Sequence, residues 1–394
     1  MSSAKKLLIV SWTVPPALGG SAYISHQLAL NFKPEEIIML GGTDRFPGSI
    51  SWYDGVRYHY ACTELHWRGH GARFLFPLRL LLFPLLLWRL SRVMSNEKPD
   101  AVLATFPDGF YLLAAWMVSG WYKIPFSAYF HNSYTDNRKG FERLVAEWIQ
   151  KRVFRDSQFL FTMSEGLMDH FTKHYPEVRH KFSVLPHTFN AYPDKQPISI
   201  KSNDAPPYRL ILIGTLNHSN MEATRRLLEC LSRHQEQYQL ELYSPTDQQI
   251  LKYKWKLDLE ALGVRHCGHV AQEAVAGLFS TYHACILTHG FTGGYTDTEY
   301  QTIFPTRTIP LLLSGLPIFA HSPENCYLTD FIRRHDCAEL VTGKEEGDIL
   351  RALERVTRDE DRIRQLLKNA RKTSALFYGP DVAGRLKAKL FGEQ

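Results

Sequence analysis

Short apolar runs alternate with amphipathic stretches along almost the whole chain, and this alternation constrains the fold more than any other feature. Runs such as 126–130 and 209–213 have the length and apolar content of buried strands, whereas 165–174 has helical spacing. Strands that alternate with helices form parallel sheets covered by helices. The sequence therefore predicts an α/β protein built from doubly wound, Rossmann-like sheets.

The same alternation occurs twice. In the first half we expect strands at 6–11, 36–40, 99–104, 126–130, 159–163 and 182–185, and helices at 22–32, 110–118, 140–154 and 165–174. In the second half we expect strands at 209–213, 240–243, 266–268, 284–288 and 317–321, and helices at 222–233, 251–262, 272–280, 306–314, 328–335 and 347–372. No fixed-period repeat is visible, which excludes solenoids and propellers.

The length of 394 residues also favours two domains, because one hydrophobic core usually organises about 100–200 residues. A stretch rich in Pro, Asp, Ser and Lys at 191–207 has no apolar period and is the expected linker. The predicted domains are 1–190 and 208–379, and a helix at about 380–394 is expected to pack back on the first. Two such sheets would bind ligands at the carboxyl ends of their strands, in a cleft between the domains.

Charge and cysteine content limit which binding partners and which cellular compartment are expected. The chain has 46 Lys and Arg against 40 Asp and Glu, and the excess lies in the first half. A modest positive field suits an acidic membrane surface or a phosphate-bearing acceptor, whereas no nucleic-acid-binding motif is present. The six cysteines form no C-x-x-C pair, so we expect reduced thiols, no metal site and a cytoplasmic protein.

One segment, FLFPLRLLLFPLLLWRL at 74–90, leaves two interpretations open. It is shorter and more charged than the ~20 apolar residues of a membrane-spanning helix. It is either an apolar helix packed into the first domain or an interfacial segment whose arginines contact lipid headgroups. The second interpretation would make the protein peripheral at the inner membrane face.

Several strand ends carry residues suited to ligands. Gly19 and Gly20 precede a helix, and Gly214 and Thr215 follow a strand, so that backbone amides could meet phosphate oxygens. His131 follows the strand at 126–130, where an imidazole could hold a sugar hydroxyl or relay a proton. The alternatives without a ligand are an ordinary turn at each glycine position and a purely structural role for His131.

A glycine-rich loop, HGFTGGYTDTE at 289–299, follows the strand at 284–288. The next segment places Thr306 and Arg307 at the start of a helix. The Arg307 guanidinium is a fork that matches pyrophosphate oxygens, and the helix start acts on the same anion. The alternative for Arg307 is a surface salt bridge.

The order of a strand, a glycine-rich loop, FPTR at 304–307, a helix and SGLPI at 314–318 resembles the donor-binding region of the retaining GT-B glycosyltransferases (family 4-like, group 1). Further stretches agree with this family in order and spacing: VPPALGG (14–20), PDAVLATFPDGF (99–110), SAYFHN (127–132), MSEGL (163–167), VLPHTFNAY (184–192) and IGTLN (213–217). The resemblance implies an acceptor-binding first domain and a donor-binding second domain. It also implies transfer of a sugar from a UDP-, GDP-, ADP- or TDP-sugar to a hydroxyl of a glycan, glycolipid or lipid-linked acceptor, with retention and without a metal.

The resemblance also assigns residues. His131 and Arg307 would be catalytic, with His131 beside the transferred sugar. The donor phosphates would contact Gly19, Gly20, Gly214, Thr215, Thr306 and Arg307, the base would contact His269 and Val270, and the sugar would contact Phe291, Thr292, Gly293 and Gly294.

Some positions depart from the family. Pro310 occupies the position where members of the family usually have a ribose-binding glutamate. Thr302 occupies the position of the acid that is the partner of this glutamate, although Asp297 and Glu299 lie nearby. Asn217 and His218 replace an Arg/Lys pair. These departures leave open a catalytically reduced binding subunit, or another two-domain sugar-nucleotide enzyme such as an epimerase or a phosphorylase.

Overall fold

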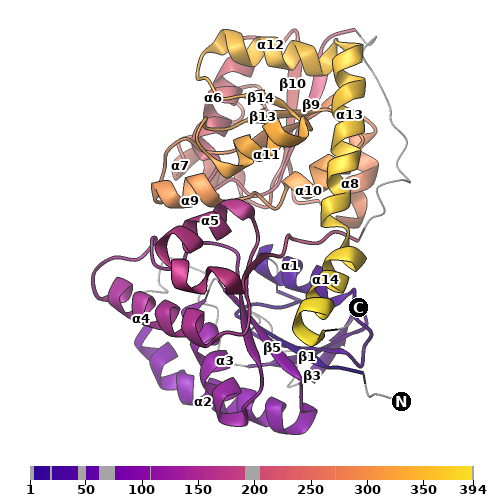
Figure 1. Ribbon diagram of the computed structural model, residues 1–394. Helices are drawn as coiled ribbons and strands as arrows, with labels where there is room; N and C mark the ends of the chain where they lie inside the picture. The colour runs from indigo at the N-terminus through magenta and orange to yellow at the C-terminus, as the bar shows by residue number, and fades with distance from the viewer. Residues whose placement is uncertain are drawn as a thin grey trace. The chain divides into compact units, whose positions relative to one another are not determined.

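The computed structural model describes residues 4–17, 20–42, 50–61, 76–106, 108–190, 205–270 and 272–392. The chain forms two compact units, which Figure 1 shows in the colours of the sequence. The first unit comprises Met1–Asn190 with Gly379–Gln394, and the second unit comprises Ala191–Tyr378.

The first unit contains an eight-stranded sheet in the order β3-β4-β2-β1-β5-β6-β7-β8. Its strands are β1 (Leu7–Ser11), β2 (Ile37–Gly41), β3 (Ile50–Tyr53), β4 (Val56–Tyr60), β5 (Ala101–Phe106), β6 (Phe126–Phe130), β7 (Leu160–Thr162) and β8 (Phe182–Val184). All neighbours pair in parallel except β3 and β4, which pair in antiparallel. The strands β1, β2, β5 and β6 are buried throughout, as both faces of a helix-covered parallel sheet should be.

The hairpin of β3 and β4 is absent from the sequence-based expectation. Its turn consists of Asp54 and Gly55, with φ of 48° and 76°. Two positive φ values in a two-residue loop are typical of the turn that matches the twist of a hairpin, and Asp-Gly is a preferred sequence for it. The first sheet is therefore parallel with one antiparallel edge strand.

The helices of the first unit are α1 (Gly20–Ala29), α2 (Phe76–Glu97), α3 (Gly109–Tyr122), α4 (Gly140–Asp156), α5 (Glu165–His174), the 3-10 helix η2 (Pro176–Lys181) and α14 (Gly379–Phe391). Helix α3 packs on β1, β5 and β6, and it also contacts α2 and α4 (Figure 1). The segment at 74–90 lies largely in α2, whose Leu86, Leu90 and Met94 are buried in the core. One side of α2 is thus packed into the core of the first unit, whereas Leu80, Leu81 and Trp88 are exposed.

The second unit contains a six-stranded, fully parallel sheet in the order β11-β10-β9-β12-β13-β14. Its strands are β9 (Tyr208–Ile213), β10 (Tyr238–Tyr243), β11 (Arg265–Gly268), β12 (Ala284–Thr288), β13 (Ile318–His321) and β14 (Glu339–Val341). Its helices are α6 (Met221–Ser232), α7 (Gln248–Tyr253), α8 (Gln272–Phe279), α9 (Asp297–Thr302), α10 (Thr308–Leu312), α11 (Tyr327–His335), α12 (Glu346–Thr357), α13 (Glu360–Ser374) and the 3-10 helix η4 (Ala375–Phe377).

Two helices of the second unit differ from expectation. The helix expected at 251–262 ends at Tyr253, and Lys256 beyond it has a φ of 54°. The helix expected at 347–372 is two helices, because Asp359 is extended and its carboxylate caps α13 by accepting from the amide of Arg362 at 3.0 Å. Helix α9 and strand β14 are not predicted at all.

The strand order of each sheet reverses once as the chain proceeds. In the first sheet the reversal lies between β1 and β5, and in the second it lies between β9 and β12. Loops at the carboxyl ends of such neighbouring strands diverge to opposite faces of the sheet and leave room for a ligand. Within the described ranges, no helix is both long and apolar enough to cross a membrane.

Candidate functional site

The loop after β9, at the reversal point of the second sheet, contacts Arg307. Nη2 of Arg307 donates to the carbonyl oxygen of Thr215 at 2.6 Å. A Cβ added to Gly214 would lie 3.5 Å from Cζ of Arg307, and Gly214 has a φ of 114°. The structure thus brings together three residues predicted from two separate motifs, and Gly214 leaves room for the guanidinium.

The backbone amide of Gly214 corrects one part of the prediction. This N–H donates to the carbonyl of Tyr243 at 2.8 Å and is used in the sheet. It is therefore not offered to a diphosphate, contrary to the sequence-based expectation. Gly214 contributes space rather than a donor.

Arg307 keeps one guanidinium nitrogen unpaired. Its Nη1 is buried and lacks a hydrogen-bond partner in the part of the chain that the structure describes. Burial lowers the pKa of Arg307 to about 10, so the group remains protonated at neutral pH. A buried, charged donor without an acceptor is costly, and an anionic oxygen would satisfy it. Thr306, which precedes it, is half-buried.

Asn220 holds the Thr215 loop from the other side. Its Nδ2 donates to the carbonyl of Thr215 at 3.2 Å, and its Oδ1 accepts from the amide of Asn217 at 3.1 Å. Asn217 in turn accepts from the amide of Ser219 at 2.9 Å. Asn217 therefore orders a loop here, and the Thr215 carbonyl links this loop to Arg307.

A second group of side chains surrounds Phe291, at the start of the glycine-rich loop. Oε2 of Glu222 accepts from the Phe291 amide at 3.1 Å, and Glu222 forms an ion pair with Arg226. The Arg226 guanidinium lies 4.9 Å from the centre of the Phe291 ring. Nη1 of Arg226 lies 3.0 Å from Nε2 of His321, whose Nδ1 lies 3.1 Å from the Val341 carbonyl.

This group was missed by sequence reasoning. Burial lowers the pKa of His321 to about 4, so His321 is neutral at neutral pH and accepts the hydrogen bond from Arg226. Glu222 and Arg226 stand four residues apart on α6, a spacing that also occurs in ordinary surface pairs. The spacing alone therefore does not separate them from a solvated helix face.

The glycines of the loop lie against its neighbours. A Cβ at Gly293 would collide with the Tyr300 hydroxyl, and a Cβ at Gly294 would lie 2.7 Å from Nδ1 of His218. The Tyr300 hydroxyl donates to the carbonyl of His218 at 2.8 Å. Gly293 and Gly294 are thus needed for loop packing, and both are exposed, as is Thr292.

The acids proposed to replace the missing ribose-binding glutamate lie in different surroundings. Glu299 is buried, with 2% of its surface exposed, whereas Asp297 is exposed in the first turn of α9. The Thr302 hydroxyl donates to the Thr298 carbonyl at 2.8 Å within α9. Pro310 lies inside α10. Of the two nearby acids, Asp297 is the one open to solvent.

The remaining predicted residues are more dispersed. His269 and Val270 follow β11, with His269 exposed and Val270 half-buried. Gly20 is the exposed first residue of α1, and Gly19 lies outside the described residues.

In the first unit, His131 directly follows β6 and is 4% exposed. It lies beside His187, which follows β8 and is also 4% exposed, with ring centroids 5.2 Å apart. In the described part of the chain, neither ring nitrogen of either histidine has a hydrogen-bond partner. Burial and the neighbouring His187 lower the pKa of His131 well below its usual range, and burial lowers that of His187 to about 3.

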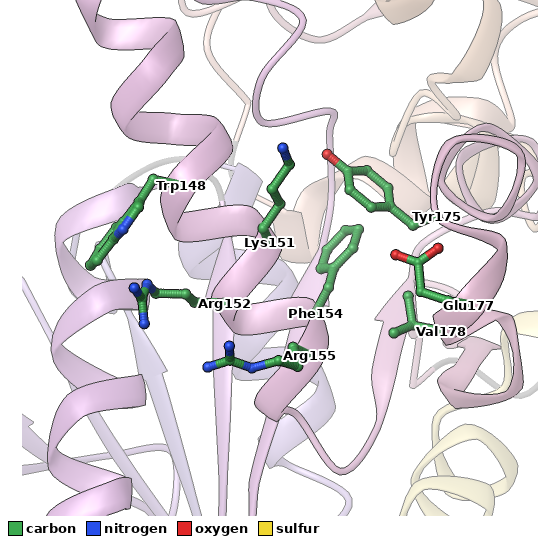
Figure 2. Close-up of a pocket in the computed structure, with 8 residues that line it drawn as sticks. All are labelled: Trp148, Lys151, Arg152, Phe154, Arg155, Tyr175, Glu177 and Val178. Carbon is green, nitrogen blue, oxygen red and sulfur yellow. The ribbon is translucent and has the colours of Figure 1, made fainter.

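A pocket of 460 Å³ lies elsewhere in the first unit, along α4 and η2. Figure 2 shows its lining of aromatic and charged side chains: Trp148, Lys151, Arg152, Phe154, Arg155, Tyr175, Glu177 and Val178. None of them is a residue predicted for the donor. Across the described residues, no three His, Cys, Asp or Glu side chains group as metal ligands would.

Comparison with known proteins supports these observations. Residues 52–191 match the family model of Glycosyltransferase Family 4. Sucrose-phosphate synthase from Thermosynechococcus elongatus superposes with a TM-score of 0.72 at 16% identity, covering 98% of this chain and 100% of that one. The lipopolysaccharide outer core galactosyltransferase WaaB gives a TM-score of 0.67 at 16% identity, covering 99% and 100%. Anabaena HepE in complex with UDP and glucose superposes with a TM-score of 0.68 at 13% identity, covering 99% of this chain and 100% of that one. No curated protein sequence matches the chain.

The two doubly wound sheets thus have the GT-B fold, and the enzyme class is that of the glycosyltransferases. Residues 52–191 are thus similar to glycosyltransferase family 4.

Proposed function

We propose that this enzyme transfers a sugar from a nucleotide diphosphate sugar to a hydroxyl of a glycan, glycolipid or lipid-linked acceptor, with retention and without a metal. The proposal assigns donor binding to the second unit and acceptor binding to the first. The observation that carries it is Arg307 at the reversal point of the second sheet, because its buried Nη1 has no hydrogen-bond partner among the described residues. A diphosphate oxygen is the acceptor that this donor fits best.

Arg307 would act on the leaving group. When the bond between the anomeric carbon and the diphosphate oxygen breaks, the bonding electrons stay on the diphosphate and its negative charge rises. A fixed guanidinium in a water-poor site stabilises that charge without having to reorganise. The acceptor hydroxyl attacks the anomeric carbon from the same face, and its proton passes to the departing diphosphate oxygen, which gives a product with retained configuration. Because the positive charge comes from Arg307, this step needs no metal ion.

The proposed donor nucleotide follows from the ligands of structurally similar proteins. Anabaena HepE was solved with UDP, and a trehalose-6-phosphate protein of similar fold was solved with UDP-2-fluoro glucose. We therefore put UDP first among UDP, GDP, ADP and TDP. The proposed diphosphate contacts are Gly19, Gly20, Thr215, Thr306 and Arg307, and Gly214 leaves room for the Arg307 guanidinium. The proposed base contacts are His269 and Val270, and the proposed sugar contacts are His131, Phe291, Thr292, Gly293 and Gly294.

We also propose that the enzyme is cytoplasmic and contacts an anionic membrane surface, as a lipid-linked acceptor would require. Helix α2 exposes Leu80, Leu81 and Trp88 to 55%, 76% and 52%, and the Arg89 and Arg92 guanidinium groups lie over the Trp88 ring. Large exposed apolar side chains beside arginines suit a bilayer interface, where the apolar groups enter and the cations meet phosphates.

Helix α4 supports the same proposal. It exposes Phe141, Leu144, Val145 and Trp148, which share one stripe because they are spaced at i, i+3, i+4 and i+7. The helix continues into the basic side chains of Lys151, Arg152 and Arg155, and Figure 2 shows Arg152 next to Trp148. An apolar half and a basic half on one face match the two layers of a membrane surface.

The test of the donor site is calorimetric titration of the purified enzyme with UDP, GDP, ADP and TDP, followed by mass spectrometry of products formed from the matching nucleotide sugars. Wild type should bind one nucleotide, and Arg307→Ala should weaken that binding about tenfold or more, the usual loss for a hydrogen bond to a charged group. Arg364→Ala, which removes an exposed arginine from α13, is the control. Equal affinity of wild type and Arg307→Ala would refute the assignment.

A further inference from the structure

His187 has no role in the proposal above, yet its position is unusual. It lies three residues beyond β8, and its ring stands at 75° to that of His131 with centroids 5.2 Å apart. Tyr129 stabilises this geometry. Its hydroxyl donates to the Leu185 carbonyl at 2.7 Å, and its ring centroid lies 4.4 Å from that of His131. The two imidazoles are therefore held in place by the ends of two different strands.

The polar atoms of this pair are unsatisfied. Four ring nitrogens are buried without a partner among the described residues, and the hydroxyl oxygen of the adjacent Thr188 is in the same condition. Leaving such a group without a partner destabilises a folded protein, and buried polar groups in proteins are nearly always satisfied. Five such atoms on consecutive or contacting residues indicate a site that a ligand completes.

The chemistry of the pair selects the ligand. A neutral imidazole offers one N–H donor and one lone pair, so two of them offer two donors and two acceptors. A hydroxyl group is itself a donor and an acceptor, and neighbouring hydroxyls of a sugar ring repeat this pattern. A phosphate or carboxylate supplies acceptors only and would leave the lone pairs unmatched. A metal ion is not the expected ligand, because the described residues offer no third His, Cys, Asp or Glu beside the two histidines.

We propose that His187 and His131 together form a site for the hydroxyl groups of a sugar ring, with Thr188 at its edge. This inference rests on the proposed function and extends it, because it assigns sugar recognition to His187, a residue of the VLPHTFNAY stretch (184–192) that was given no role there. The sugar belongs either to the donor or to the acceptor, and both present the same hydroxyl chemistry. His187 is a binding residue here, and it needs no change of protonation to act.

The decisive variant is His187→Phe, which keeps a planar ring but removes both polar atoms. In the donor arm, calorimetry compares UDP with UDP-glucose, and GDP with GDP-mannose. His187→Phe should bind the nucleotide within twofold of wild type and the nucleotide sugar at least about tenfold more weakly, since one hydrogen bond of 1.4 kcal/mol equals a factor of ten.

In the acceptor arm, saturation-transfer NMR follows the methyl glycosides of glucose, galactose and mannose in the presence of the nucleotide. If the pair holds the acceptor, His187→Phe loses the transfer signal that wild type gives, while the donor affinities stay equal. Either result supports the site and states which sugar it holds. Unchanged behaviour in both arms would overturn the inference.

Two further variants separate binding from folding. His187→Gln keeps one donor and one acceptor and should restore affinity to within about fivefold; it also serves if His187→Phe fails to fold. The matched control is His26→Phe, which removes another buried histidine of the same unit whose Nδ1 already lies 2.6 Å from the Tyr58 hydroxyl. It should lower the melting temperature without changing the ratio of nucleotide to nucleotide-sugar affinity. A wild type that binds no nucleotide sugar would refute the proposed function itself, which is a different outcome.

Discussion

The guanidinium of Arg307 lies against the backbone of Gly214, so that a single added methyl group at Gly214 would stand 3.5 Å from Cζ of Arg307. These residues are 93 positions apart in the sequence, at the ends of different elements. Their contact joins the loop after β9 to the start of α10. It also holds the charged group that we propose binds the diphosphate.

Gly214→Ala should therefore impair both stability and donor binding. A φ of 114° is costly for any residue with a Cβ, by roughly 1–3 kcal/mol, and the new methyl group presses on Arg307. Thermal melting and nucleotide titration measure the two effects. Gly384→Ala is the control, because nothing lies within 4 Å of its added Cβ in α14 and alanine favours a helix. Equal behaviour of the two variants would contradict the role given to Gly214.

Acid should destabilise the enzyme through His321. Its pKa is about 4 in the folded protein against an ordinary 6.5, so the unfolded chain takes up the proton first as the pH falls. The free energy of unfolding should thus decrease between pH 6.5 and pH 4, by up to about 3 kcal/mol from this group.

Urea unfolding of His321→Asn at pH 7 and pH 5 checks this expectation. The variant should be less stable at pH 7, because it loses contacts to Arg226 and Val341, but its stability should change less between the two pH values. His180→Asn, at an exposed position of η2, should keep the wild-type pH dependence. A wild-type slope in His321→Asn would show that other groups cause the acid sensitivity.

Flotation with anionic liposomes should recover the wild-type enzyme, and recovery should fall as salt is raised, because part of the attraction is electrostatic. Phe141→Glu with Leu144→Glu on α4, and Leu80→Glu with Leu81→Glu on α2, should each reduce recovery at least severalfold. Ile250→Glu on α7 changes an exposed apolar residue of the second unit, 47% exposed, and should have no effect. Absence of wild-type flotation would remove the membrane proposal and leave the donor site untouched.

Transfer should continue in excess EDTA at within about twofold of the untreated rate, since the proposed charge stabilisation comes from Arg307. The measurement is product formation from the nucleotide sugar found by titration. Loss of activity in EDTA, with recovery on addition of Mg²⁺ or Mn²⁺, would show that a cation shares the diphosphate.

The architecture could be predicted because apolar periodicity is a local signal. The strands at 126–130 and 284–288 and the helix at 165–174 agree with the structure at both ends. The hairpin of β3 and β4 was missed although Asp54-Gly55 is a strong turn signal, because its strands carry polar residues among the aromatic ones.

The site was less predictable, because it depends on contacts between distant residues. The motif around Gly214 indicated a ligand loop, but only the pairing with β10 shows that its amide is already used. Similarly, His187 stood in a stretch that looked like the end of a domain. Its importance follows from its distance to His131 and from ring nitrogens that are buried without a partner in the described part of the chain, and a sequence displays neither.

Helix α14 belongs to the first unit although it follows the whole second unit in the chain. Its Lys387 pairs with Glu36 at 2.6 Å, its Leu386 and Leu390 are buried, and the Gly379 amide donates to the Phe189 carbonyl at 3.1 Å. During translation, the ribosome therefore releases residues 1–190 long before their last helix exists. Until α14 is synthesised, we expect the apolar surface that Leu386 and Leu390 cover to stay exposed on the nascent first unit. Exposed apolar surface of this kind is what chaperones bind.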